Sequence, residues 1–226
     1  MSFKYYLYIS DSKVDMLLPQ IDPAFDTRNR SEFGVNLKVL TAKRVTQPPA
    51  DQRIARLEQV VRHLHDYGDL GGVDEPGQFF SGLLPMRWEF PTPPGSTSSP
   101  SPRRTDSSLV FFGGQSENTV VGLGGSRRHV LGSAPDPPGP APSQLPELLE
   151  ELGVSSALED EYVADALDAH LDGADIAALA RVRGAVAALR GPAQNLEFVA
   201  KRLLHGRPLH GQNVLLGSPV YVAQVD

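Results

Sequence analysis

The stretch SSLVFFGGQSENTVVGLGGSRRHVLG, residues 107–132, decides the fold class of this 226-residue chain. Its two segments Leu109–Phe112 and Thr119–Leu123 are apolar at successive positions and rich in β-branched and aromatic residues. That pattern is typical of interior strands covered on both faces. Gln115–Asn118 between them predicts a hairpin loop, and Gly124–Ser126 predicts a second turn.

Strands are predicted on both sides of this stretch. Arg128–Leu131 follows the second turn and is expected to form a third strand. Alternating or β-rich patterns predict four more strands, at Phe3–Ser10, Gly34–Leu40, Phe79–Phe90 and Val214–Val225. Because proline cannot donate to a ladder, Pro85 requires a bulge or an edge position.

Helices are predicted from apolar residues at helical spacing. A short helix follows the capping sequence Ser10-Asp11-Ser12, with Pro19 near its end, and a second helix runs from about Asp51 to Tyr67. Residues 146–205 are expected to be mainly helical. That segment comprises Pro146–Leu152, Leu158–Leu171, Ala174–Leu189 and a helix that starts at Pro192 and carries Leu196 to Leu204.

These elements predict a single α+β domain over residues 1–226. A mixed, mostly antiparallel central sheet is packed by helices, and the helical C-terminal half returns to a final strand. Two Pro-rich stretches, residues 91–106 and 133–145, have the composition of disordered loops.

The composition excludes several classes of function. The formal charge is −6, which argues against bulk nucleic-acid binding. The chain has no cysteine, so disulfides, thiolate metal sites and a cysteine nucleophile are excluded. No apolar run approaches the roughly 20 residues that span a bilayer. Because the N-terminal segment lacks the features of a signal peptide, we expect a cytoplasmic protein.

The densest polar cluster is the end of the opening stretch, where Gly124 and Gly125 precede Ser126, Arg127, Arg128 and His129. Glycines let backbone N–H groups approach an anion, and arginines pair with phosphate or carboxylate. The sequence is neither a Walker A motif nor a dinucleotide fingerprint. It therefore predicts either an anion site or a tight turn followed by a strand with charged side chains facing solvent.

Two enzymatic hypotheses involve the same cluster. Ser126 and His129 could form a hydrolase triad with Asp11 or Asp15, although the GxSxG elbow is absent. Alternatively, Asp11 and Asp15, with Lys13 between them, could hold a metal beside a phosphate bound by the cluster. This second hypothesis requires the end of the first strand and the glycine turn to lie in one cleft. Helix capping is the simpler explanation of Asp11 and Asp15.

Two further residues are candidates for ligand contact. Trp88, the single tryptophan, could stack on a base or sugar beside Arg87, although a core tryptophan with an extended arginine fits the same pattern. The six histidines form no zinc-binding spacing, so no metal site is predicted. The sequence identifies no cofactor.

Segments across the whole chain resemble an uncharacterised actinomycete family, a domain of unknown function. They include KYYLYISDSKVDMLLPQI, MRW, VVGLGGSRRHVLG, LEFVAKRLLHG and VLLGSPVYVA. The resemblance implies one complete domain and no particular activity. Because the sequence shows a glycine-arginine cluster but no complete catalytic constellation, we expect a non-enzymatic module that senses a small anionic ligand or engages a protein partner. The alternatives are a metal-assisted nucleotide- or phosphoester-acting enzyme and a self-assembling subunit.

Overall fold

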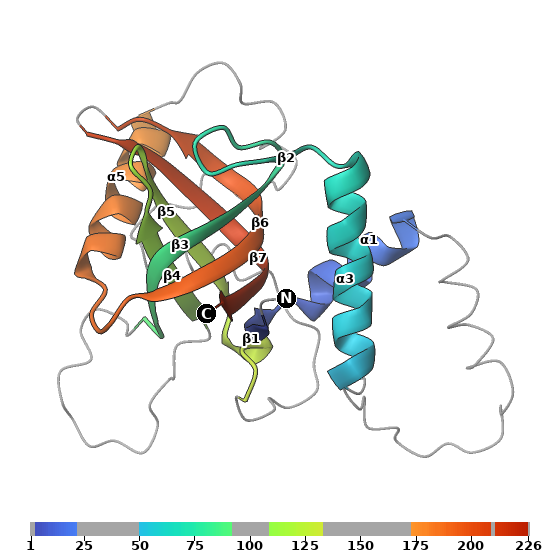
Figure 1. Cartoon of the computed structure of the whole chain (residues 1–226). Helices are drawn as coiled ribbons and strands as arrows, with labels where there is room; N and C mark the ends of the chain where they lie inside the picture. Colours follow the sequence, from blue (N-terminus) through green and yellow to red (C-terminus); the bar gives the residue numbers. More distant parts are fainter. Residues whose placement is uncertain (1–2, 22–49, 92–108, 133–172, 209–210, 226) are drawn as a thin grey trace, which may run out of the picture.

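The structure is a computed structural model that describes residues 3–21, 50–91, 109–132, 173–208 and 211–225. Within those residues the fold is α+β, with a mixed five-stranded closed barrel, two outer strands and three helices (Figure 1). None of the helices there is long and apolar enough to cross a membrane. Five predicted features lie outside the described residues, apart from Pro91: the strand Gly34–Leu40, the two Pro-rich loops, and the helices Pro146–Leu152 and Leu158–Leu171.

The order of elements matches most of the predicted order. The helices are α1 (Asp11–Ile21), α3 (Ala50–Tyr67), α5 (Gly173–Ala188) and the short 3-10 helix η1 (Arg127–His129). The strands are β1 (Lys4–Ile9), β2 (Leu70–Gly71), β3 (Phe79–Glu89), β4 (Leu109–Gln115), β5 (Thr119–Ser126), β6 (Gln194–Gly206) and β7 (Asn213–Val225). The predicted β4–β5 hairpin is confirmed, as are the strands predicted at Phe3–Ser10, Phe79–Phe90 and Val214–Val225, which form β1, β3 and β7.

The sheet closes into a barrel, which the sequence did not predict. The strands follow the order β3, β4, β5, β7, β6 and back to β3, and only the β5–β7 pair in this ring is parallel. Val121 of β5 faces Leu215 of β7, and Phe80 of β3 faces Ala200 of β6. Closure leaves the outer strands β1 and β2 to pair with β7 and β3 respectively.

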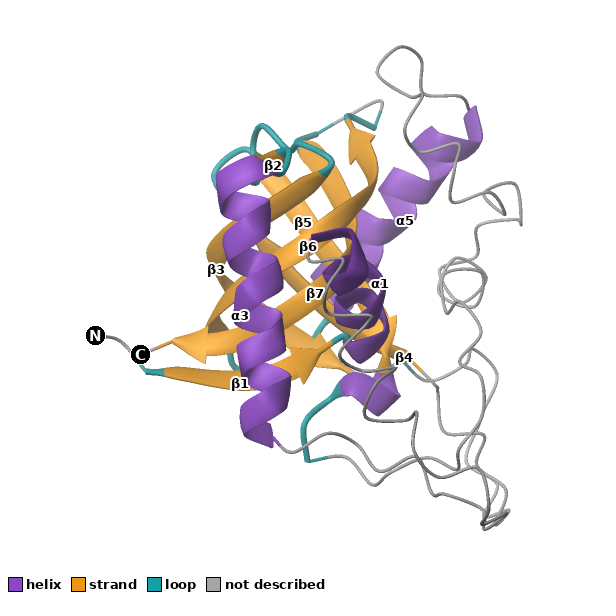
Figure 2. Ribbon diagram, turned by 90° about the vertical axis from the view of Figure 1, so that its right-hand side faces the viewer, coloured by secondary structure: helices purple, strands orange, loops and turns teal. Residues whose placement is uncertain are grey.

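The barrel wall is buried on both faces. In β4, Val110 and Phe112 belong to the inner core with Tyr8, Phe80 and other buried residues. The alternate β4 residues Leu109 and Phe111 pack outward under α5. On the other side of the barrel, α1 and α3 cover a third apolar cluster (Figure 2). The prediction that the β4 and β5 segments are covered on both sides is therefore confirmed.

The predicted helix after Pro192 is wrong, because this segment forms strand β6. Leu196, Phe198 and Ala200 alternate toward the inner core, whereas Val199 contributes to the cluster under α1 and α3. A strand buried on both faces is apolar at nearly every position, so a helical stripe can also be drawn through it. Pairing with β3 and β7 along its length decides in favour of the strand.

Two predictions in the opening stretch are also wrong. Gly124–Ser126 is not a turn, because these residues continue β5 opposite β4. The third strand predicted at Arg128–Leu131 is instead the single turn η1, followed by an isolated bridge between Val130 and Tyr8. Glycines in this strand are needed for close packing rather than for a reversal, since a Cβ on Gly125 would lie 2.6 Å from the Tyr8 hydroxyl oxygen.

Strand β7 changes neighbours along one edge. Residues 213–217 pair with β5, and residues 221–225 pair with β1, while β6 occupies the other edge. Strand β5 runs parallel to β7, and β1 runs antiparallel to it. The C-terminal ends of β5 and β1 therefore both lie beside the part of β7 between Gly217 and Tyr221. Pro219 lies in this interval, and Pro85 lies in the matching interval of β3, between its β2 and β4 pairings. Both prolines therefore sit where one strand edge is without a ladder partner.

Candidate functional site

The candidate site lies where β1 and β5 end beside the same part of β7. The chain leaving β1 is anchored by the Ser10 amide, which donates to the Val220 carbonyl at 2.8 Å. The chain leaving β5 turns through η1 and returns to β1, where the Leu131 amide donates to the Leu7 carbonyl at 2.9 Å. This convergence places the start of α1 beside η1, although more than 100 residues separate them in sequence.

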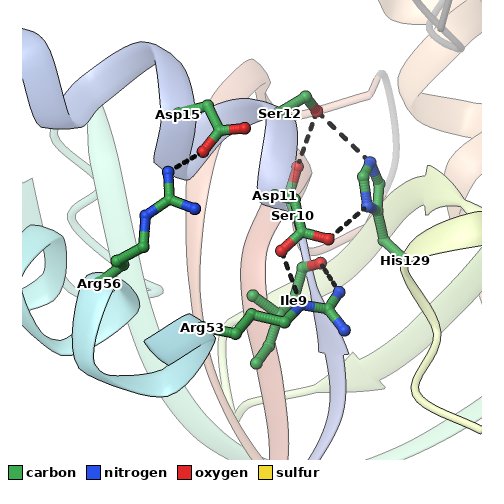
Figure 3. Close-up of polar contacts among 8 residues, drawn as sticks. All are labelled: Ile9, Ser10, Asp11, Ser12, Asp15, Arg53, Arg56 and His129. Carbon is green, nitrogen blue, oxygen red and sulfur yellow. Dashed lines mark hydrogen bonds and ion pairs between the residues drawn. The ribbon is translucent and has the colours of Figure 1, made fainter. Parts of the chain in front are cut away.

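His129 lies at the centre of the polar cluster (Figure 3). Its Nδ1 atom is 3.7 Å from Asp11 Oδ2, and its Nε2 atom is 3.4 Å from Ser12 Oγ. The imidazole is 8% exposed and packs edge-to-face on the Tyr8 ring, at 5.8 Å between ring centroids. The buried Tyr8 therefore covers the inner side of the imidazole, whereas Ser12 lies on its solvent-exposed side.

Arg53 at the start of α3 fixes the Asp11 carboxylate. Its Nε donates to Asp11 Oδ1 at 2.6 Å, and its Nη2 donates to the Ile9 carbonyl at 3.1 Å. Burial acts to raise the pKa of Asp11. The interactions with His129 and Arg53 outweigh it and hold that pKa below its usual range. Asp11 is therefore an ionised carboxylate with one oxygen toward Arg53 and the other toward His129.

Two serines frame the first turn of α1. Ser10 is 1% exposed, whereas Ser12 is exposed, and their hydroxyl oxygens lie 3.3 Å apart. Burial raises the pKa of the neighbouring Tyr8 hydroxyl above its usual range, against opposing hydrogen bonds with the Ser10 side chain and the Ser126 backbone. Of these two serines, Ser12 is the one that combines contact with His129 and access to solvent.

The carboxylates predicted as metal ligands face arginines. Asp15 pairs with Arg56, as Asp11 pairs with Arg53. Together these ion pairs join α1 to α3 (Figure 3). Within the described parts of the chain, no group of three or more potential metal-ligating side chains is found. Lys13, between the two aspartates, is half-buried in the first turn of α1.

The residues of the glycine-arginine cluster separate in the structure. Gly124, Gly125 and Ser126 are buried in β5. The Arg127 guanidinium lies over the Phe90 ring, 4.4 Å from its centroid, and Arg128 is half-buried in η1. His129 contacts Asp11 and Ser12 in the first turn of α1, so the serine hydroxyl beside the imidazole is that of Ser12 rather than the predicted Ser126.

Arg87 and Trp88 belong to a different part of the barrel wall. Arg87 Nε donates to the Gly191 carbonyl at 2.8 Å, and Trp88 Nε1 donates to Gln194 Oε1 at 3.4 Å. The indole also packs against Phe90 and Phe112. This packing is that of a partly buried core residue beside an extended arginine.

Sequence reasoning placed Asp11 and His129 among the candidates but missed Ser12 and Arg53. Ser12 was considered only as a helix-capping residue, and Arg53 only as one position of a helix. The sequence does place both residues at the start of a predicted helix, Ser12 in the first and Arg53 in the second. What the sequence could not show is that β7 brings those boundaries together.

The fold and the cluster define an α+β barrel protein with a Ser–His–Asp–Arg constellation at the ends of two strands. The chain belongs to a family of unknown function, DUF7019, which it matches over residues 4–226. A search of curated proteins finds no match, and no solved structure matches the chain.

Proposed function

We propose that this protein is a ligand-binding module that recognises a small anionic ligand at the Ser12–His129 site. The observation that carries the proposal is the position of His129, which bridges the ionised Asp11 and the exposed Ser12. The proposal keeps the non-enzymatic function expected from the sequence but moves its site from the glycine-arginine turn to the start of α1.

Hydrogen-bond donors converge on the exposed side of this site. A protonated imidazole donates from both nitrogens, so Nδ1 can face Asp11 while Nε2 faces Ser12 and the ligand. The Ser12 hydroxyl adds a second donor. The first i→i−4 bond of α1 joins the Val14 amide to the Ser10 carbonyl, so the amides of Asp11 and Ser12 precede the helical ladder. The helix dipole favours an anion at the same end.

The anionic-ligand hypothesis fits the contacts better than the metal-assisted alternative. A metal held by Asp11 and Asp15 would have to compete with Arg53 and Arg56 for the same carboxylate oxygens. A carboxylate or phosphate ligand leaves both ion pairs intact. The cytoplasmic location, the protein partner and the oligomeric state expected from the sequence stay predictions.

Phosphate binding tests the proposal. Isothermal titration of the full chain with inorganic phosphate, acetate and ATP should detect binding of at least one of these ligands. Replacing His129 with glutamine should weaken that binding about tenfold or more, because it removes a charge-assisted donor. Circular dichroism would show that the variant is folded.

Arg127→Ala is the matched control. Its guanidinium lies over the Phe90 ring, 4.4 Å from the centroid, and we expect binding of this variant to stay within about twofold of wild type. The proposal is wrong if the wild-type chain binds none of the three ligands. It is equally wrong if Arg127→Ala loses as much affinity as His129→Gln.

A further inference from the structure

We propose that Ser12 is also a covalent acyl acceptor, activated by His129 as general base and positioned by Asp11. This inference goes beyond reversible binding but uses the same site. It rests on the order of the contacting atoms rather than on the identity of the anion. Its readout is a covalent adduct, so it can succeed or fail independently of phosphate binding.

The order of atoms is that of a serine nucleophile with its base. Ser12 Oγ faces Nε2 of the imidazole, and the Asp11 carboxylate faces Nδ1 on the opposite side of the ring. A neutral imidazole that donates from Nδ1 to Asp11 carries its lone pair on Nε2, where it can accept the serine proton. At 3.4 and 3.7 Å, both contacts are longer than the roughly 2.6–3.2 Å of a catalytic hydrogen bond, so we expect both to shorten during the reaction.

The surrounding contacts favour Ser12 over the other serines near His129. Ser10 is 1% exposed and Ser126 is 8% exposed in β5, so neither is open to an electrophile. Ser12 is exposed above an imidazole that is itself buried. The two remaining requirements are an orienting acid and an oxyanion site.

Asp11 and the first turn of α1 meet those requirements. Arg53 holds Asp11 Oδ1, which leaves Oδ2 directed at His129 and limits the rotation of the carboxylate. The amides of Asp11 and Ser12 precede the helical ladder and can donate to an oxygen that becomes negatively charged during attack. A tetrahedral oxyanion thus meets the same donors that we assign to a bound anion.

The expected reaction is transfer of an acyl group from an activated ester. The Ser12 hydroxyl proton moves to His129 Nε2 as Oγ forms a bond to the carbonyl carbon. The bond between that carbon and the leaving oxygen then breaks, and the leaving group departs as an alcohol or alkoxide that takes up a proton from His129 or water. The product is one ester on Ser12 per chain, with no oxidant or metal required.

The first test uses p-nitrophenyl acetate and intact-mass spectrometry. Wild-type protein should release p-nitrophenolate in a burst and gain one acetyl group on the peptide that contains Ser12. Acetylation of that peptide should vanish in Ser12→Ala and fall about a hundredfold in His129→Gln, and should stay unchanged in Ser126→Ala.

The second test exploits the absence of cysteine from the chain. Ser12→Cys creates a protein with a single thiol, whose alkylation by iodoacetamide should be about tenfold faster than in the Ser12→Cys/His129→Gln double variant. Met16→Cys places a thiol at an exposed position of the same helix and is the control, with a rate indifferent to His129→Gln. The inference is overturned if wild type gains no acetyl group on Ser12. It is also overturned if His129→Gln leaves both the acetylation and the alkylation rates unchanged.

Discussion

Replacing Gly125 with alanine is expected to lower the free energy of unfolding by about 3 kcal/mol. The added Cβ would lie 2.6 Å from the Tyr8 hydroxyl oxygen and 2.8 Å from its Cζ atom. The Tyr8 side chain has no room to move away, because it is 1% exposed and packs edge-to-face against both Phe112 and His129. For a chain of this size the loss corresponds to a fall in Tm of about 10 °C.

Urea unfolding followed by circular dichroism measures this effect, and two further variants make it specific. Gly184→Ala lies on the exposed side of α5 with no atom within 4 Å of the new Cβ, so it should stabilise the protein by about 0.5 kcal/mol. Tyr8→Phe removes the nearest atom and should make the Gly125→Ala change less costly in the double variant. Wild-type stability in Gly125→Ala would show that Tyr8 does not pack on β5 as described.

Replacing Asp11 with asparagine is expected to lower the free energy of unfolding at pH 7 by about 2 kcal/mol. The change leaves the Arg53 side chain, which is 12% exposed, without its counter-charge, and it also removes the carboxylate beside His129. Because folding lowers the pKa of Asp11, its stabilising contribution is present above the unfolded-state pKa of about 3.9 and is lost as the pH falls through the folded-state value.

The difference in stability between wild type and Asp11→Asn should therefore shrink when urea unfolding is repeated at about pH 3. Asp15→Asn is the control, since the Asp15 side chain is 56% exposed and its pair with Arg56 is screened by solvent. That control should change stability by no more than about 0.5 kcal/mol. Equal losses for the Asp11 and Asp15 variants, or a pH-independent loss for Asp11→Asn, would contradict the assigned ion pair.

The sequence predicts elements well where the pattern admits one structure. The strand β1, the amphipathic helix α3 and the β4–β5 hairpin carry unambiguous periodicities, and each forms close to its predicted position. The segment that became β6 shows the limit of this approach. Its apolar residues satisfy helical and extended spacing equally, and only pairing with β3 and β7 selects between them.

Barrel closure and the site depend on pairings that local patterns do not contain. Nothing in the sequence of β5 indicates that it runs parallel to β7, which lies about 90 residues further along the chain. Gly124 and Gly125 are strand residues rather than a turn because they pair with Phe111 and Val110 of β4. Within η1, the Arg127 side chain lies over Phe90 whereas His129 contacts Asp11, so the candidate residues were identified in part while their grouping was not.

The position of β7 has a consequence for biosynthesis. This strand pairs with β1, β5 and β6, and it is the last described element of the chain. A nascent chain therefore cannot close the barrel, or align β1 with β5, until residues 213–225 have left the ribosome. Ser12 and His129 are synthesised early, whereas the strand that aligns the ends of β1 and β5 is made about 80 residues after His129.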